Sequence, residues 1–361
     1  MKIFTPSLLL ALVASFITAC VGGDNSGKLT SGYKPEQPSA PADALFQKLD
    51  GAASGIQFKN QITENHDLNI VTLAYLYNGG GVGVIDVNND GQQDLFFSST
   101  MGACKLYLNK GGLKFDDISQ SAGVEASTGL KTGVTIIDIN SDGKQDIYLC
   151  RTTLKPNDDS KNLLFINNGN NTFTESAAAY GLDDNSPSNL ANFFDCDNDG
   201  DLDCFLINHS VDYGNVSSVR VKDVGNGRIE RILEPALPFE SSRLYLNNGN
   251  NTFTDVTKKA GLYSRAFSLS VTALDLNGDG FKDIMVGNDY IDPDFVYINN
   301  PSQPGTFNDR LSNTFRHFSN HTMGVDFGDI NNDGLNEIMA LDMLAEPAVR
   351  RQELMSTMTL D

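Results

Sequence analysis

Residues 84–99 read VIDVNNDGQQDLFFSS: an apolar run, nine residues of the pattern D-x-[DN]-x-D-G-x-x-[DE], and a second apolar run. The nonapeptide occurs five times, at residues 86–94, 138–146, 195–203, 275–283 and 329–337, so its copies begin 52, 57, 80 and 54 residues apart. Periods of this size are typical of repeat proteins, in which each unit is one supersecondary structure. The acidic nonapeptide therefore sets the organisation of the chain.

Two further motifs alternate with the nonapeptide. An apolar-aromatic segment ending in Asn follows it, as in KLYLNKG (105–111) and RLYLNNG (243–249), and a Phe-led segment comes next, as in FDDISQSAGV (115–124) and FTDVTKKAGL (253–262). The runs around each nonapeptide are short, β-branched and aromatic, and Asn-Gly before the Phe-led segment is typical of a tight hairpin. Each unit therefore predicts four short antiparallel strands, the composition of a blade in an all-β propeller.

These motifs resemble the FG-GAP/VCBS repeats of integrin-α-like propellers, and over residues 44–344 the chain resembles bacterial lipoproteins of the CRTAC1/UnbV-like type. The resemblance implies calcium-binding blades, about seven in an intact ring, and a UnbV-type C-terminal domain. Five nonapeptides occur, and the fifth unit reaches only its second strand, so we expect a fragment of a longer protein. Residues 46–56 (FQKLDGAASGI) resemble an unpaired fourth strand that would close the ring.

The nonapeptides are predicted Ca²⁺ sites. Positions 1, 3, 5 and 9 carry side-chain oxygens, Gly at position 6 permits a sharp turn, and position 7 offers its carbonyl oxygen. An EF-hand is excluded because its twelfth position would fall on apolar residues, and Mg²⁺ is disfavoured because it resists dehydration. Acidic Asx-turns without metal would explain one loop but not five. The predicted ligands are Asp86, Asn88, Asp90, Gln92, Asp94, Asp138, Asn140, Asp142, Lys144, Asp146, Asp195, Asp197, Asp199, Asp201, Asp203, Asp275, Asn277, Asp279, Phe281, Asp283, Asp329, Asn331, Asp333, Leu335 and Glu337.

The charge balance agrees with this interpretation. Among 361 residues, 46 Asp and Glu outweigh 26 Lys and Arg, for a formal charge of −20. Such a balance argues against nucleic acid as a partner, since that role needs a basic surface. Sixteen of the 46 acidic residues lie at the nonapeptide positions, so we attribute the negative charge mostly to about five structural Ca²⁺ ions.

The N-terminus predicts export and lipidation. Lys2 precedes an apolar run from Leu8 to Ile17, so we expect residues 1–19 to be a signal peptide. The sequence ITAC (17–20) resembles a lipobox, which implies that Cys20 is lipidated, although an ordinary signal peptide with a nearby Cys is the alternative. Residues 20–43 predict a flexible tether and residues 44–361 the propeller. We expect a lipid-anchored protein at the bacterial cell envelope, in the outer membrane, periplasmic or surface-exposed.

The spacing of the cysteines and histidines leaves open whether a disulfide and a zinc site are present. The spacing of Cys104, Cys150, Cys196 and Cys204 matches no zinc pattern. Cys196 and Cys204 lie at the two ends of the third acidic loop and form either a disulfide or buried free thiols. His317 and His321 have the i, i+4 spacing of a zinc helix, but the sequence around them predicts strand and turn.

Length variation points to a ligand face. If the nonapeptides are the 1–2 connections, both the insertion at about residues 209–242 and the long stretch before the first nonapeptide fall on the opposite face. One-sided insertions in repeat proteins often mark the binding face, although a tolerated solvated loop is the alternative. The candidate ligand-face residues are Tyr75, Tyr77, Arg151, His209, Tyr213, Arg220, Lys222, Arg228, Arg231 and Tyr290.

These observations favour a non-enzymatic module that binds a protein or glycan. A lectin is one alternative, against which the absence of Trp counts. A polysaccharide-degrading enzyme is another; it needs paired acids outside the nonapeptides, and no such pair stands out.

Overall fold

The computed structural model describes residues 46, 48–211, 220–226, 228–232, 235, 237–290, 292–317, 319 and 321–343. The chain divides into two units, Met1–Leu49 and Asp50–Asp361, and almost every described residue lies in the second. The predicted signal peptide, Cys20, the tether and Tyr213 lie outside the described residues. None of the described helices is long and apolar enough to cross a membrane.

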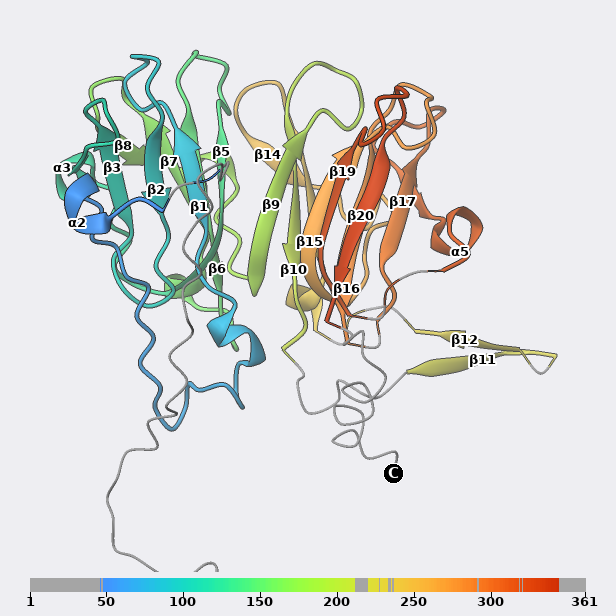
Figure 1. Cartoon of the computed structure of the whole chain (residues 1–361). Coiled ribbons are helices and arrows are strands. Elements are labelled where there is room, and N and C mark those ends of the chain that lie inside the picture. The colour runs from blue at the N-terminus through green and yellow to red at the C-terminus, as the bar shows by residue number, and fades with distance from the viewer. Residues whose placement is uncertain are drawn as a thin grey trace, which may run out of the picture. The chain divides into compact units, whose positions relative to one another are not determined.

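The second unit consists of consecutive antiparallel sheets (Figure 1). Blade 1 contains β1 (Val82–Ile85), β2 (Asp94–Phe97), β3 (Lys105–Asn109) and β4 (Phe115–Asp117), and blade 2 contains β5 (Leu130–Ile137), β6 (Asp146–Thr152), β7 (Leu163–Asn167) and β8 (Phe173–Glu175). Blade 3 contains β9 (Ser188–Phe194), β10 (Asp203–Asn208), β13 (Arg243–Asn247) and β14 (Phe253–Asp255). Blade 4 contains β15 (Phe267–Leu274), β16 (Asp283–Asp289), β17 (Phe295–Asn299) and β18 (Phe307–Asp309), and β19 (Thr322–Gly328) pairs with β20 (Glu337–Asp342) as the first half of a fifth blade. The prediction of four-stranded antiparallel blades is confirmed.

The hydrophobic cores lie between blades. One core joins Ile85 and Phe96 of blade 1 to Ile147 and Leu149 of blade 2. Equivalent cores join blades 2 and 3, blades 3 and 4, and blade 4 with the fifth unit. A single four-stranded sheet has no partner for its apolar faces, so each blade is stabilised by its neighbours.

The first strands of neighbouring blades also contact each other through side chains. Thr135 Oγ1 of β5 donates to the carbonyl oxygen of Ala191 in β9 (2.7 Å). Thr272 Oγ1 of β15 donates to the carbonyl oxygen of Val325 in β19 (3.3 Å). The order of blades in space therefore follows their order in the chain.

The Phe-led segments differ from the sequence prediction. Only three residues form a strand, after which the chain makes one helical turn: α3 (Ser119–Ala122) and α4 (Ala177–Tyr180), with α5 (Leu311–Thr314) in blade 4. The strand ends because an Asp side chain captures a backbone N–H two residues on, as Asp117 Oδ1 accepts from Ser119 N (3.0 Å). The turns α3 and α4 end at glycines with positive φ, Gly123 (77°) and Gly181 (74°), whereas α5 ends at Phe315 in an extended conformation.

The hairpins between third and fourth strands are also longer than predicted. Asn109 pairs with Phe115 and Asn167 with Phe173, so five residues form the connection rather than the two of a tight turn. The Asn side chain shapes this loop, because Asn167 Oδ1 accepts from Gly169 N (2.9 Å).

Residues 50–55 take the form of a blade terminus. Instead of the predicted unpaired strand, α2 (Gly51–Ser54) makes a helical turn that is capped by Asp50 and ends at Gly55 with φ 89°. Gly55 lies against the Phe115 carbonyl of blade 1, just as Gly181 lies against the Phe253 carbonyl of blade 3. The segment therefore packs against blade 1 in the same way as the helical turn at the end of blade 2 packs against blade 3.

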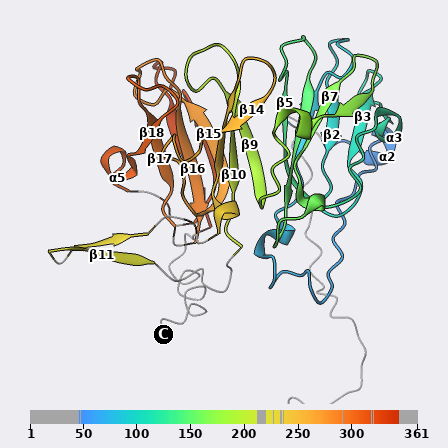
Figure 2. The same cartoon turned by 180° about the vertical axis from the view of Figure 1, so that it is seen from behind.

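The five nonapeptides lie together at one end of the blades, at the top of Figure 1. The hairpin formed by β11 (Val221–Gly225) and β12 (Arg228–Arg231) projects from the opposite end in both views (Figures 1 and 2). Three short 3₁₀ turns, Ala74–Tyr77, Asp158–Ser160 and Pro238–Glu240, complete the described elements.

Candidate functional site

The five nonapeptides share one network of backbone hydrogen bonds. In the first, Asp86 accepts from the N–H groups of Asp90 (3.1 Å) and Gly91 (2.8 Å), and Asp90 accepts from the N–H of Gln92 (2.8 Å). The same three bonds recur in each of the other four loops. The network turns each loop around the carboxylate at position 1. Among the described residues, the third loop is the one in which three acidic side chains come within 4.8 Å of one another.

Position 9 attaches each loop to its blade. Asp94, Asp146, Asp203 and Asp283 are at most 2% exposed. Each accepts one N–H from position 2 of its own loop and another from the Asn that ends the third strand. Glu337, in the fifth loop, keeps the first of these bonds, from Ile330 N (2.8 Å), and is only half-buried. The ninth residue therefore ties the loop to the sheet.

These buried carboxylates are electrostatically costly. Burial raises the pKa of Asp146 and of Asp203 to about 6, against the opposing effect of the backbone N–H groups they accept from. Neighbouring carboxylates add to the rise, Asp142 beside Asp146 and Asp197 beside Asp203. Burial likewise raises the pKa of Asp94 and Asp283. A cation at the centre of each loop would remove both penalties.

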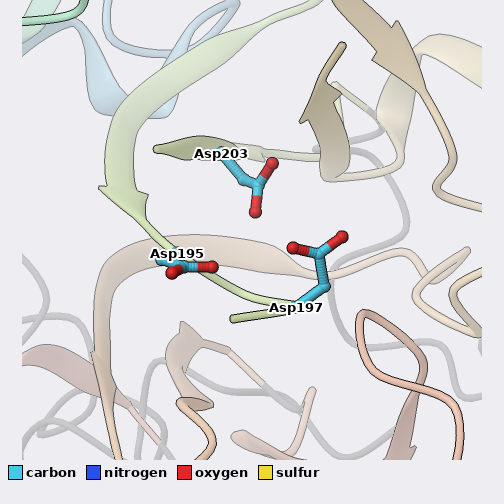
Figure 3. Close-up of side chains that lie close together, drawn as sticks. All are labelled: Asp195, Asp197 and Asp203. Atoms are coloured by element: carbon cyan, nitrogen blue, oxygen red, sulfur yellow. The ribbon is translucent and has the colours of Figure 1, made fainter. Parts of the chain in front are cut away.

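The third loop fits a calcium ion by distance. Oxygens of Asp195, Asp197 and Asp203 all lie within 4.8 Å of one another (Figure 3). Ligands that are each 2.3–2.6 Å from a shared Ca²⁺ ion are at most about 5 Å apart, so this spacing suits such an ion. Asp199 and Asp201 bring the loop to five acidic residues, and Ca²⁺ affinity depends on the number of charged ligands.

The other loops replace one carboxylate with an amide. Asn88, Asn140 and Asn277 occupy position 3, and each donates its Nδ2 to the carboxylate at position 5 (3.0, 3.4 and 2.9 Å). In the second loop the Lys144 ammonium also lies 2.8 Å from Asp142 Oδ2, although this residue was predicted to contribute only its carbonyl. A resident ammonium competes with a metal ion, so the second loop offers a weaker cation site than the third.

At the opposite end, the structure brings together three of the predicted ligand-face residues. The Tyr75 ring is 5.3 Å from the His209 ring and 6.4 Å from the Tyr290 ring, and Tyr75 Oη donates to Asp289 Oδ2 (3.2 Å). His209 is only 2% exposed and Arg151 only 6%. This group is therefore mostly an internal cluster, held by the turn Ala74–Tyr77.

The remaining candidate ligand-face residues are dispersed. Tyr77 is 55% exposed. Arg220 precedes the β11–β12 hairpin, which carries Lys222 and Arg228, and Arg231 ends β12. The hairpin is exposed at every described side chain, so it is accessible to a partner.

His209 is a neutral histidine. Its Nδ1 lies 3.0 Å from the Ser210 carbonyl oxygen, which only accepts, so Nδ1 carries the proton. Thr152 Oγ1 then donates to Nε2 (2.9 Å). Burial lowers the pKa of His209 to about 4, which keeps the ring uncharged at neutral pH.

The two alternatives for cysteine and histidine are resolved by geometry. Cys104, Cys150, Cys196 and Cys204 are all free and buried, so the Cys196–Cys204 disulfide does not form. His317 and His321 lie on no helix; His321 instead faces Asp289 (3.2 Å).

Two kinds of residue were missed from the sequence. The Asn that ends each third strand (Asn109, Asn167, Asn247 and Asn299) organises the loop, and its recurrence in the apolar-aromatic motif was a visible signal. Lys131, which is fully buried beside the internal cluster, gave no signal, because one Lys in a strand is usually exposed.

Comparison with known proteins agrees with this geometry. The family described as FG-GAP-like repeat matches residues 86–149, 138–206, 225–286 and 275–340. Cartilage acidic protein 1 from Xenopus tropicalis is 29% identical over 213 residues (59% of this chain, 29% of the relative), and that from Mus musculus is 27% identical over 166 residues (39% and 25%). The chain thus spans less than a third of the length of these curated relatives.

Two solved structures are similar at low identity. One is an Agrocybe aegerita lectin that recognises non-reducing terminal N-acetylglucosamine (17% identity, TM-score 0.32, 72% of this chain and 73% of that one). The other is the V. cholerae biofilm matrix protein Bap1 (16%, TM-score 0.23, 63% and 40%). Superpositions this weak contribute nothing to the choice of ligand.

Proposed function

Because the chain belongs to the FG-GAP-like repeat family, we propose that it is a non-enzymatic β-propeller, stabilised by calcium, that binds a protein or glycan. Its loop end holds the ions, and the opposite end contacts the partner. On the strength of residues 1–20 we further propose that it is lipid-anchored at Cys20 in a bacterial cell envelope.

One observation carries the calcium proposal: the same hydrogen-bonded loop, with a carboxylate at position 9 tied into the sheet, occurs five times at one end of the blades. An acidic loop without a counter-ion costs stability, and five such loops multiply that cost. Ca²⁺ suits the sites because the donors are all oxygens and the loops are short and flexible at Gly.

The binding role is supported by the connections at the end of the blades that lies opposite the nonapeptides. Long connections lie opposite the nonapeptides, and one of them, the exposed β11–β12 hairpin, carries Lys222 and Arg228. Binding residues are disproportionately found on loops that a rigid scaffold positions. The cavity that contains Lys131 and His209 has no acidic residue among its described lining, so it lacks the paired acids that a glycosidase needs.

Calorimetric titration of the metal-free full chain with CaCl₂ tests the first part. We expect binding at about five sites and a rise in melting temperature that EDTA reverses. Each site contributes about 2.7 kcal/mol of stability when free Ca²⁺ is a hundredfold above its Kd.

The variant Asp203→Asn should lose one binding event, whereas Asp116→Asn, at an exposed carboxylate of β4, should keep them all. Identical melting curves with Ca²⁺ and with EDTA would refute the calcium proposal. A glycan array and a protein pull-down, each with and without Ca²⁺, would then separate a lectin from a protein-binding module. Turnover of a polysaccharide would contradict the non-enzymatic assignment.

A further inference from the structure

A cavity of about 170 Å³ opens where four blades meet the segment before β1. Its apolar wall comes mostly from Leu73, Leu76, Leu190 and Leu269. Its polar groups include Thr100 of blade 1, Lys131 and Thr152 of blade 2, and Asn189 and His209 of blade 3. A mostly apolar cavity with a few convergent polar groups is the usual form of a small-molecule site.

Lys131 is the unusual member of this lining, because its side chain is fully buried. Its ammonium donates to the carbonyl oxygens of Gly129 (2.9 Å) and Thr128 (3.3 Å). An ammonium has three donors, so one is left over. Among the described residues no carboxylate forms an ion pair with it.

A second buried cation stands directly beside it. Arg151 pairs with Lys131 across β5 and β6 and is 6% exposed. Its Nη1 donates to the Lys161 carbonyl oxygen (3.3 Å), while its Nε has no partner among the described residues. Like charges directly opposite each other in a sheet are destabilising, and buried charges are normally paired.

Among the described residues that line the cavity there is no Asp or Glu, although Asp159 and Glu175 act on the neighbouring Arg151 and oppose the lowering of its pKa by burial. Burial raises the pKa of Cys104, so its thiol stays protonated at neutral pH despite the two cations nearby. Burial, and then Arg151, lower the pKa of Lys131 to about 8, so it remains mostly charged at pH 7. His209 is neutral, as shown above. The described cavity therefore has a net positive charge in a low-dielectric setting, which favours an anion.

Thr100 offers a second donor close to Lys131. Lys131 N donates to the Thr100 carbonyl oxygen (3.0 Å), which places the two residues side by side. Thr100 Oγ1 accepts from Asn60 Nδ2 (3.0 Å), so its own O–H is left to donate. One ammonium and one hydroxyl match the two oxygens of a carboxylate.

We propose that this cavity binds the carboxylate of a small organic acid, with Lys131 and Thr100 as its donors and the leucines against its carbon skeleton. A phosphate is a poorer occupant, because its greater charge and additional oxygens need more donors than an otherwise apolar wall provides. The inference rests on the binding role proposed above but not on calcium.

Calorimetry and melting curves of the calcium-saturated full chain test the proposal. The probes are acetate, lactate and D-glucuronate, with acetamide and D-glucose as uncharged counterparts. We expect at least one carboxylate to bind and to raise the melting temperature, and both uncharged compounds to do neither.

Lys131→Met keeps the volume of the side chain but removes the charge, and it should weaken carboxylate binding about tenfold or more. Without ligand it should melt at the same or a higher temperature, because an uncompensated buried charge is lost. Lys59→Met, at an exposed lysine, is the matched control. Thr100→Val provides a second variant that leaves Lys131 in place, with a smaller loss expected.

Stabilisation by none of the three acids at tens of millimolar, or stabilisation that Lys131→Met retains, would overturn the proposal. Calcium binding is measured in the same samples. If it persists while the acids fail, only this inference is lost, and the propeller's calcium-stabilised role stands.

Discussion

The Asn that ends a third strand should stabilise the contact between two blades, and Asn167 is the sharpest case. Its Nδ2 donates to the Val87 carbonyl oxygen of blade 1 (2.9 Å) and to the Gln145 carbonyl oxygen (3.2 Å), while Oδ1 accepts from Gly169 N (2.9 Å). The side chain is 2% exposed. Replacing Asn167 with Ala therefore removes three hydrogen bonds and leaves buried backbone groups without partners.

Each such bond contributes about 1 kcal/mol net, so Asn167→Ala should cost about 3–4 kcal/mol of unfolding free energy. Asn247 is the matched control, because it has the same place in blade 3 but only two longer bonds, to Leu202 O (3.4 Å) and from Gly249 N (3.1 Å). Asn247→Ala should cost about 1–2 kcal/mol. Asn299, which donates to the Cys196 carbonyl oxygen of blade 3 (2.7 Å), should behave like Asn167.

Urea unfolding measures the difference, followed by both fluorescence and circular dichroism to check for a single transition. The midpoint should fall further for Asn167→Ala than for Asn247→Ala, with unchanged slopes. The experiment is run in EDTA, so that altered ion binding cannot account for the result. Equal losses for the two variants would show that the bond between blades contributes nothing, and the reasoning would be refuted.

Three further predictions concern His209, Gly181 and the cysteines. The folded pKa of His209 is about 4, below its ordinary value, so its contribution to stability is complete above about pH 6.5 and declines as the pH falls to 4. Urea titrations at each pH measure the difference in unfolding free energy between the wild type and His209→Gln. This difference should shrink by about 3 kcal/mol as the pH falls through that window. A constant difference would contradict the assignment of His209 as a neutral histidine. Gly181→Ala should destabilise the protein by about 1–3 kcal/mol more than Gly225→Ala. Both glycines have positive φ (74° and 87°), but only at Gly181 would the new Cβ lie 2.9 Å from a backbone atom, the Phe253 carbonyl oxygen. Equal urea midpoints for the two variants would count against this contact. The four described cysteines should react with a thiol reagent only after unfolding, and rapid modification of the native protein would show that they are accessible.

Much of the fold was predictable because its information is local. The alternation of strand residues, the nonapeptide and the Asn at the end of the third strand each act within about ten residues. Four-stranded blades and the loop-end carboxylates followed from these patterns. The lengths of the strands and hairpins did not, since an Asp side chain that captures a backbone N–H and a glycine cap decide where a strand stops.

By itself, the sequence determined the repeat, the blade and the set of oxygens in each loop, because turn chemistry and side-chain alternation are properties of short segments. Only the tertiary structure decided what the blades enclose. Tyr75 reaches Asp289 across 214 positions, and Asn167 reaches Val87 across 80. The buried pair Lys131 and Arg151 is positioned by strand register, and its cavity by the packing of four blades against one turn. The burial of both cations, and the lack of an ion pair to Lys131 among the described residues, are properties of that packing, which no short stretch of sequence encodes.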